Sequence, residues 1–218
     1  LGDNSTTGSF GSGAVTNNGA IIVNRSNDLS ITNVISGTGG TLTKQNTNVL
    51  TLTQNNTYTG ITTISAGTLQ LGDNSTTGSF GSGAVTNNGV IIVNRSNDLS
   101  ITNAISGTGT LTKQNTNVLT LTQNNTYSGN NTISAGTLVL QNDAPNPTNK
   151  TFNGTGQLRI EPASASTSFS SAFSTTGWTF NSTLTGLTIG KANNTANVTN
   201  TLNQTINGPI SVFGGTFT

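Results

Sequence analysis

The chain of 218 residues contains no cysteine, no histidine and no methionine. Without cysteine it forms no disulfide, and without cysteine and histidine it lacks the usual zinc ligands and the Ser-His-Asp and Cys-His nucleophilic machinery. Only 6% of the residues are charged and the net charge is +1, which argues against a nucleic-acid-binding protein. No apolar run approaches the roughly 20 residues of a membrane helix, so we expect no membrane insertion of this segment.

Small polar residues dominate what is present, with 44 Thr, 33 Asn, 27 Gly and 23 Ser. Short runs of β-forming residues, such as 20–23, 49–52 and 69–71, alternate with clusters of Gly, Asn and Ser. This alternation is typical of strands and turns, and no stretch shows the 3.6-residue apolar period of a helix. The sequence therefore predicts an all-β chain rather than a disordered one.

An internal repeat divides the chain into three segments. Residues 1–10 recur as 71–80, and the offset falls from 70 to 69 after Gly39-Gly40. We define copy one as 1–70 and copy two as 71–139, and we expect 140–218 to continue the same solenoid with divergent coils. The missing residue must fall in a turn, because a loss inside a strand would turn every later side chain to the opposite face.

A long repeat built from short strands predicts a solenoid. We expect a right-handed parallel β-helix with about three coils of about 23 residues per repeat, hence roughly nine to ten coils in a rod roughly 45 Å long. The alternative is a set of separate β-sandwich domains of about 70 residues, which would need larger cores and more aromatic residues.

Six aligned positions differ between the copies, and two groups of them yield predictions: 20/90, 34/104, 59/128, 61/130, 62/131 and 70/139. Ala20 with Val34 becomes Val90 with Ala104, a volume-conserving swap that predicts inward-facing neighbours. The differences at 59–62 predict an exposed turn with a tyrosine, Tyr58 or Tyr127, packed at its base.

Part of each copy resembles a known family. The matching residues are Gly40 to Lys44, Leu50 to Thr53, Asn56 to Ile64 and Ala66 to Gly72 in copy one, and Gly109 to Lys113, Asn125 to Gly129 and Ala135 to Leu138 in copy two. This text resembles the autotransporter-associated β-strand repeat of secreted bacterial passengers. The chain departs from the family at Gln45-Asn46, where the family has glycine soon after the lysine, and at Asn131 and Gln141.

The last segment reads differently. Residues 184–191, 208–210 and 214–216 resemble segments of large filamentous-haemagglutinin-type adhesins. Together the two resemblances imply a parallel β-helix in a long surface-exposed or secreted bacterial protein. They imply neither a ligand nor an active site.

The acidic residues are candidates for catalysis, and they are Asp3, Asp28, Asp73, Asp98, Asp143 and Glu161. Polysaccharide-cleaving β-helix enzymes need clustered carboxylates, whereas Asp in Asp-Asn and Asn-Asp dipeptides caps turns. We favour turn roles and predict no catalytic, metal or cofactor site. Arg25 with Asp28 and Arg95 with Asp98 are spaced for ion pairs, and an isopeptide crosslink would require Glu161 beside Lys150 or Lys191.

Two binding alternatives remain open. Thr-x-Thr pairs at 41/43, 51/53, 110/112 and 120/122 raise the possibility of ice binding, which needs one flat, outward threonine face. Late aromatic residues raise the possibility of a glycan-binding patch, although filling of an irregular core is the favoured explanation: Phe169, Phe173, Trp178, Phe180, Phe213 and Phe217.

We therefore predict a non-enzymatic structural and adhesive segment of a long bacterial surface or secreted fibre. Its expected partners are neighbouring copies or the rest of a longer chain, with a host or matrix glycan as a further candidate. The expected location is extracellular, at the bacterial cell surface. Because residues 1–4 match 71–74 in mid-unit, we also expect the segment to belong to a longer protein, with open coils at both ends.

Overall fold

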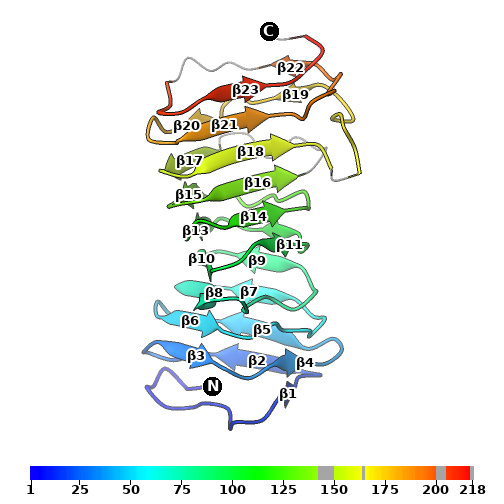
Figure 1. Cartoon of the computed structure of the whole chain (residues 1–218). Helices are drawn as coiled ribbons and strands as arrows, with labels where there is room; N and C mark the ends of the chain where they lie inside the picture. The colour runs from blue at the N-terminus through cyan, green and yellow to red at the C-terminus, as the bar shows by residue number, and fades with distance from the viewer. Residues whose placement is uncertain (142–149, 164, 200–204, 217–218) are drawn as a thin grey trace.

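The computed structural model describes residues 1–141, 150–163, 165–199 and 205–216. Parallel strands stack along one axis from the N-terminal end, at the bottom of Figure 1, to the C-terminal end at the top. None of the described residues lies in an α-helix. The chain is thus the β-solenoid of about nine coils that the sequence predicted.

The strands are short and follow one another at regular intervals. In chain order they are β1 (Val15–Thr16), β2 (Ala20–Val23), β3 (Leu29–Ile31), β4 (Ile35–Ser36), β5 (Thr41–Lys44), β6 (Val49–Leu52), β7 (Thr62–Ile64), β8 (Thr68–Ser75), β9 (Val85–Asn87), β10 (Val90–Arg95), β11 (Leu99–Ile101), β12 (Ile105–Ser106), β13 (Thr110–Lys113), β14 (Val118–Leu121), β15 (Asn131–Ile133), β16 (Thr137–Gln141), β17 (Thr151–Gly154), β18 (Gln157–Glu161), β19 (Phe173–Ser174), β20 (Thr179–Phe180), β21 (Gly186–Ile189), β22 (Val198–Thr199) and β23 (Ile210–Val212).

The strands form three faces, which the chain visits in a fixed order. Face 1 carries the sheets β1-β4 and β11-β14-β16-β18-β21-β23, face 2 carries β2-β5-β7-β9-β12 and β19-β22, and face 3 carries β3-β6-β8-β10-β13-β15-β17-β20. Loop backbones continue face 1 between its two sheets, because Thr57 N donates to Ile35 O and Ser82 N donates to Tyr58 O, each at 2.8 Å. Every pairing is parallel, as a single coiling path requires.

Strand register gives the length of a coil. Ala20 pairs with Thr41, Val49 with Thr68 and Thr62 with Val85, so that one coil of the two copies takes between 19 and 23 residues. The repeat is consequently longer than the three coils expected. In each copy the chain crosses a face ten times, and each crossing is one pass. Because three passes complete one coil, ten passes amount to three coils and one additional pass.

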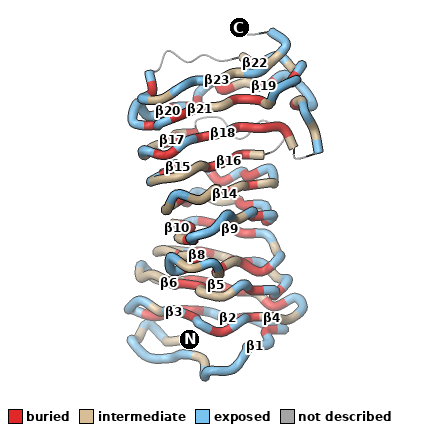
Figure 2. The backbone as a smooth tube through the Cα atoms, viewed as in Figure 1, coloured by how far each residue is buried: buried red, intermediate tan, exposed pale blue. Residues whose placement is uncertain are grey.

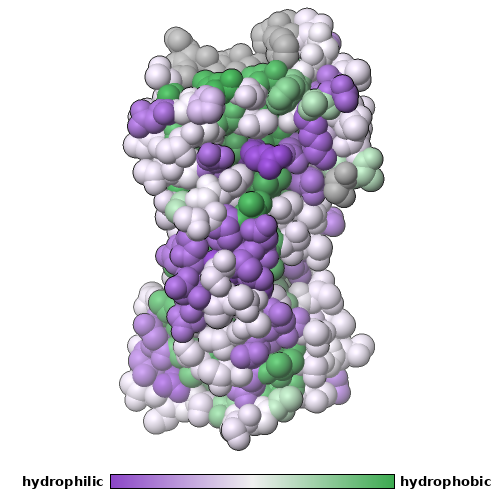
Figure 3. Space-filling model, in the orientation of Figure 1, coloured by the Kyte–Doolittle hydropathy of each residue, from purple (hydrophilic) through white to green (hydrophobic). Residues whose placement is uncertain are grey.

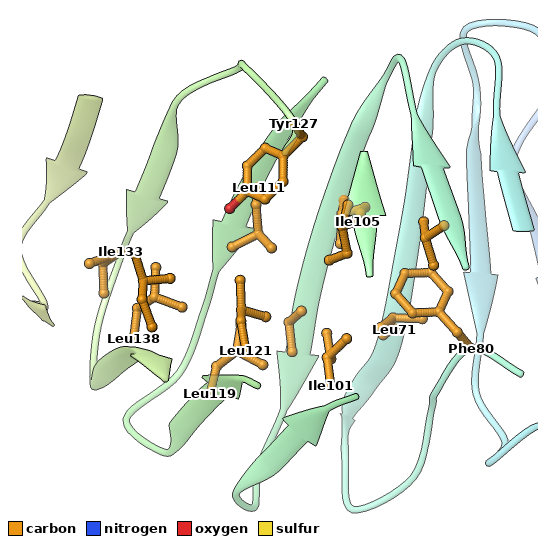
Figure 4. Packing of buried hydrophobic residues seen from close by; sticks show 14 of the residues in the cluster. Leu71, Phe80, Ile101, Ile105, Leu111, Leu119, Leu121, Tyr127, Ile133 and Leu138 are labelled. Atoms are coloured by element: carbon orange, nitrogen blue, oxygen red, sulfur yellow. The ribbon is translucent and has the colours of Figure 1, made fainter. Parts of the chain in front are cut away.

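The core is a set of apolar ladders that run along the axis. On face 3, Leu29, Leu50, Leu69, Ile91 and Leu111 pair in one inward row. Side chains alternate between the two sides of a strand, so the neighbouring residues face solvent. Figure 2 shows the buried positions recurring at every level of the rod, and Figure 4 shows leucines, isoleucines and Tyr127 filling the same interior.

The structure tests two predictions that came from comparing the copies. Gly39 and Gly40 lie between β4 and β5, and both strand pairs keep their burial pattern in copy two, so the missing residue falls in a turn as predicted. The prediction for positions 20 and 34 is wrong. Val34 is 39% exposed and Ala20 is exposed, because both alternate with inward isoleucines and point outward.

The third segment has a wider coil and an aromatic core. Thr151 pairs with Thr179, 28 residues later, and the rings of Phe152 and Phe180 stack with centroids 5.6 Å apart. Phe169, Phe173 and Trp178 are also buried, which confirms that these aromatics fill an irregular core. Phe213 is 39% exposed, and Phe217 lies outside the described residues.

Candidate functional site

The aspartates of the repeat cap turns. Asp28 Oδ1 accepts the amide hydrogen of Val49 at 2.8 Å, and Asp98 Oδ1 accepts that of Val118 at the same distance. Each carboxylate thereby supports the first amide of the strand in the next coil. The predicted turn role is confirmed at these two positions, while Asp143 lies outside the described residues.

The acidic residues do not gather. Among the described residues, no group of three or more His, Cys, Asp or Glu side chains is close enough to hold a metal ion. Two grooves on the described surface are lined by Ser, Thr, Asn, Gln, Gly, Ala135 and Phe80, and neither contains a carboxylate. The arrangement that acid-base catalysis requires is therefore not found in these two grooves.

The arginines do not pair with the aspartates three residues later, contrary to the spacing argument. Arg25 and Arg95 are 8% and 5% exposed and bind loop oxygens, whereas Asp28 and Asp98 are exposed. The cause is the alternation of side chains along the strand, in which every second residue points inward. Arg95 ends β10 two residues after the inward-facing Val93, so its side chain turns toward the interior.

Arg95 ties together a loop and two coils. Its Nη1 donates to Gly78 O at 3.0 Å and to Asn55 Oδ1 at 3.1 Å. Its Nη2 donates to Thr76 O, and Nε and Nη2 both reach Asn97 Oδ1. All five guanidinium hydrogens have oxygen acceptors, which offsets burial of the charge without a carboxylate. Burial lowers the pKa of Arg95.

Two lysines are fully buried in oxygen cages at strand ends. Lys44 Nζ donates to Gln45 O at 2.5 Å, Asn46 O at 2.8 Å and Asn48 Oδ1 at 2.9 Å. Copy two reproduces the cage around Lys113 with Gln114 O, Asn115 O and Asn117 Oδ1. Burial lowers the pKa of each ammonium to about 8, against the raising effect of a nearby aspartate. The alternation of side chains along the strand could have predicted this burial, since Lys44 lies two residues after the inward-facing Leu42 and therefore points to the same side.

Asparagines stack at the same corners. Asn46 Nδ2 donates to Asn24 Oδ1 at 2.7 Å and to Asn4 Oδ1 at 3.0 Å, and Asn115 repeats the pattern with Asn94 and Asn74. Asn46 has φ of 60°. This is the left-handed conformation that asparagine tolerates and glycine favours. The departure from the family at Gln45-Asn46 therefore leaves the turn geometry intact.

The turn after each tyrosine is only partly as predicted. Ile61 is 50% exposed, Asn130 is exposed, and Tyr58 is fully buried, as expected. Position 62/131 is the exception, because it begins a strand and points inward. The Thr62 hydroxyl lies 2.7 Å from Tyr58 Oη, which burial keeps at a raised pKa.

In copy two, Asn131 takes the place of Thr62. Its Oδ1 accepts a hydrogen bond from Tyr127 Oη at 2.5 Å, while its buried Nδ2 has no partner. Among the described residues, the pocket thus supplies a hydrogen-bond donor to the Asn131 oxygen but no acceptor for its Nδ2.

The isopeptide arrangement is not formed in the described part of the chain. Glu161 pairs with Arg159, while Lys150 Nζ donates to Tyr127 O and lies 3.4 Å from the centroid of that ring. Lys191 Nζ reaches Ser166 O at 3.3 Å. Burial lowers the pKa of Lys150 to about 8.

The threonine pairs do not form one flat face. Thr41 and Thr43 lie on face 2, the pairs at 51/53 and 110/112 belong to face 3, and the pair at 120/122 belongs to face 1. The geometric condition that ice binding requires is thus not met by these pairs.

The surface of the two copies carries few charges, and those it carries are carboxylates. Arg25, Lys44, Arg95 and Lys113 are all buried, whereas the four aspartates of the copies are exposed. Figure 3 shows mainly side chains of hydrophilic or intermediate hydropathy over the middle of the rod. What the repeats offer a partner is therefore a surface of hydroxyl and amide groups with isolated carboxylates.

The described residues include no helix that could cross a membrane.

Comparison with known proteins finds similarity within each of the two repeats. The passenger-associated-transport-repeat family matches residues 42–71 and 111–140. A stretch of 84 residues is 45% identical to the adhesin BmaC autotransporter of Brucella suis biovar 1 (strain 1330), which amounts to 38% of this chain and 2% of that protein. No solved structure matches the chain. The resemblance to autotransporter passengers is thereby confirmed, while the filamentous-haemagglutinin resemblance of the last segment stays a prediction.

Proposed function

We propose that this chain, whose residues 42–71 and 111–140 are passenger-associated-transport repeats, is a non-enzymatic structural and adhesive segment of a long bacterial surface or secreted fibre. It would act outside the cell, at the bacterial surface. The carrying observation is the uninterrupted parallel ladder on face 3, in which eight strands from β3 to β20 pair in succession. Such a ladder transmits load along the axis through backbone hydrogen bonds at every coil.

The chemistry of the repeats supports a passive and exported rod. Its apolar ladders, asparagine stacks and caged cations would stabilise it without disulfides. The absence of cysteine also suits export, because no disulfide can form in transit. The sides of the repeats carry only four isolated exposed aspartates over residues 1–139, so neighbouring fibres, or a host or matrix glycan, would approach with little repulsion.

Display on a non-adherent laboratory bacterium tests the proposal. Cells carrying the chain should adhere to cultured epithelial cells, or settle together, several-fold more than cells displaying a chain in which Leu50, Leu69 and Leu111 are replaced by Asp to unfold the rod. Equal adherence of both strains would refute an adhesive role. Hydrolysis of polysaccharides by the purified chain would refute the non-enzymatic assignment.

A further inference from the structure

Equivalent strands of the two copies lie on different faces of the rod. β2 belongs to face 2, and its counterpart β10 belongs to face 3. β3 belongs to face 3, and its counterpart β11 belongs to face 1. Each counterpart is displaced by one face in the same direction, so the displacement is a property of the repeat and not of one strand.

The number of passes in a repeat explains this displacement. Copy two crosses a face ten times, eight times as strands β9 to β16 and twice as loop backbone at 79–82 and 126–128. One coil uses three passes, so ten passes leave one over. Because a coil takes between 19 and 23 residues, the number of passes does not follow from the repeat length alone.

We infer that the 70-residue repeat is a screw unit, which turns each surface feature by one third of a turn and advances it about 16 Å, or three and a third strand spacings. This chain therefore displays one recognition surface twice, in two directions. The partner that this geometry fits is an extended layer bearing many receptors, such as a cell or matrix surface. The role in adhesion rests on the proposed function, whereas the one-third turn of the repeat does not.

The duplicated surface is chemically the same in both directions. Residues 26–33 and 96–103 are identical in sequence. Ser30 and Ser100 are exposed at equivalent places, as are Thr32 and Thr102. The aspartate of each stretch caps the next coil at the same distance of 2.8 Å. A receptor that recognises hydroxyl groups beside this carboxylate on one copy will find them again on the other.

The consequence is adhesion that depends little on how the rod is rotated about its long axis. A surface encoded on one face only would bind an underlying layer in one rotational orientation. A surface repeated after a third of a turn is available to the layer from two of the three faces of this chain.

Distances between paired spin labels test the geometry in the full chain, which has no native cysteine to label. Ser30 and Ile92 lie in one outward row of face 3, three coils apart, so Ser30→Cys with Ile92→Cys should give about 14 Å between backbone positions. Ser30→Cys with Ser100→Cys has a similar axial separation but spans two faces. We expect a clearly longer distance for this pair, and equal distances for the two pairs would overturn the inference.

An antibody fragment raised against the sequence shared by 26–33 and 96–103 gives a second readout. Two fragments should bind each chain and diverge by about a third of a turn in negative-stain images. Ser30→Arg and Ser100→Arg should each reduce the stoichiometry from two to one. Parallel fragments would refute the screw unit, whereas diverging fragments on a chain that fails to adhere to cells would refute only the proposed function.

Discussion

Copies one and two differ at few positions, yet their equivalent strands lie on different faces of the rod, and this separates the effects of sequence from those of position. The lysine cages, the asparagine stacks and the aspartate caps are the same in both copies. Each lysine cage is built from residues 44–48 or 113–117 of one corner, whereas the aspartate caps and asparagine stacks join two or three adjacent coils. Local contacts are therefore fixed by the sequence of neighbouring coils, whichever face they occupy.

The copies differ where their first loop meets another coil. Phe80 is 4% exposed, and Arg95 reaches Asn55, which is 40 residues earlier and two coils below it. Within these 218 residues, Phe10 and Arg25 have no such coil below them, and Phe10 is only partly buried. In a chain made of these 218 residues the same loop sequence therefore has different support in the two copies, and equivalent substitutions should differ in effect there.

The largest expected difference concerns the loop phenylalanines. Phe80→Ala should destabilise the coils of copy two by about 3–5 kcal/mol, because it empties a buried site, whereas Phe10→Ala should lose clearly less. Hydrogen exchange of the amides in β8 to β10 and in β1 to β3 measures each effect locally. Equal losses would show that the supporting coil contributes little.

The loop arginines come next. Arg95→Leu should cost about 3 kcal/mol, because buried carbonyl and amide oxygens lose charged donors. Arg25→Leu should cost about 1.5 kcal/mol less, since Arg25 lacks the bond corresponding to Asn55. Asn55→Ala is the matched control, because it should remove most of the difference while leaving Arg25 unaffected. Hydrogen exchange of the two loops decides between these outcomes.

The fold could be predicted from sequence because it depends on alternation and repetition, both visible in the text. Leu42, Leu50 and Leu69 recur in strand phase, and Gly39-Gly40 sits where a turn must be. The one-third turn could not be predicted, since the passes at 57–59 and 126–128 carry no strand pattern. The burial of the lysines and arginines was not predicted, because charged residues are normally exposed. Their position in the inward-facing half of the strand alternation was not considered.

The candidate surface was predicted less well. The opposite Ala/Val exchanges at 20/90 and 34/104 were interpreted as packing, although an exposed position also accepts Ala or Val freely. Aromatic residues identified the wider core but not a binding patch, since whether Phe173 or Trp178 points inward depends on the path of a coil with no repeat to compare. What a partner contacts depends on the direction of each face, which is a tertiary property.

The caged lysines should behave alike, which makes them a test of the shared local contacts. With the pKa lowered to about 8 in the folded state, the unfolded chain binds more protons above pH 8, so stability should rise from pH 8 to about 10. Above pH 10 it should fall, because the pKa values of Tyr58 and Tyr127 are raised by burial. Lys44→Met and Lys113→Met should each flatten the rise by the same amount, about 2 kcal/mol at most. Urea unfolding at several pH values measures this, and unequal slopes would mean that the faces are not electrostatically equivalent.

The smallest expected effect is an exchange at position 62/131. Asn131→Thr should stabilise copy two by about 1 kcal/mol, because threonine can bond the tyrosine hydroxyl without leaving an amide group unpaired. Rotating the Asn131 amide does not remove the problem, since either its oxygen or its nitrogen is then without a partner. Thr62→Asn should destabilise copy one by a similar amount, because Tyr58 has the same buried place there as Tyr127. Hydrogen exchange of β7 and β15 compares the two variants directly. Opposite and equal shifts would show that the two pockets are interchangeable. A loss of stability in Asn131→Thr would mean instead that the contact of Lys150 with Tyr127 has made the pocket of copy two a different one.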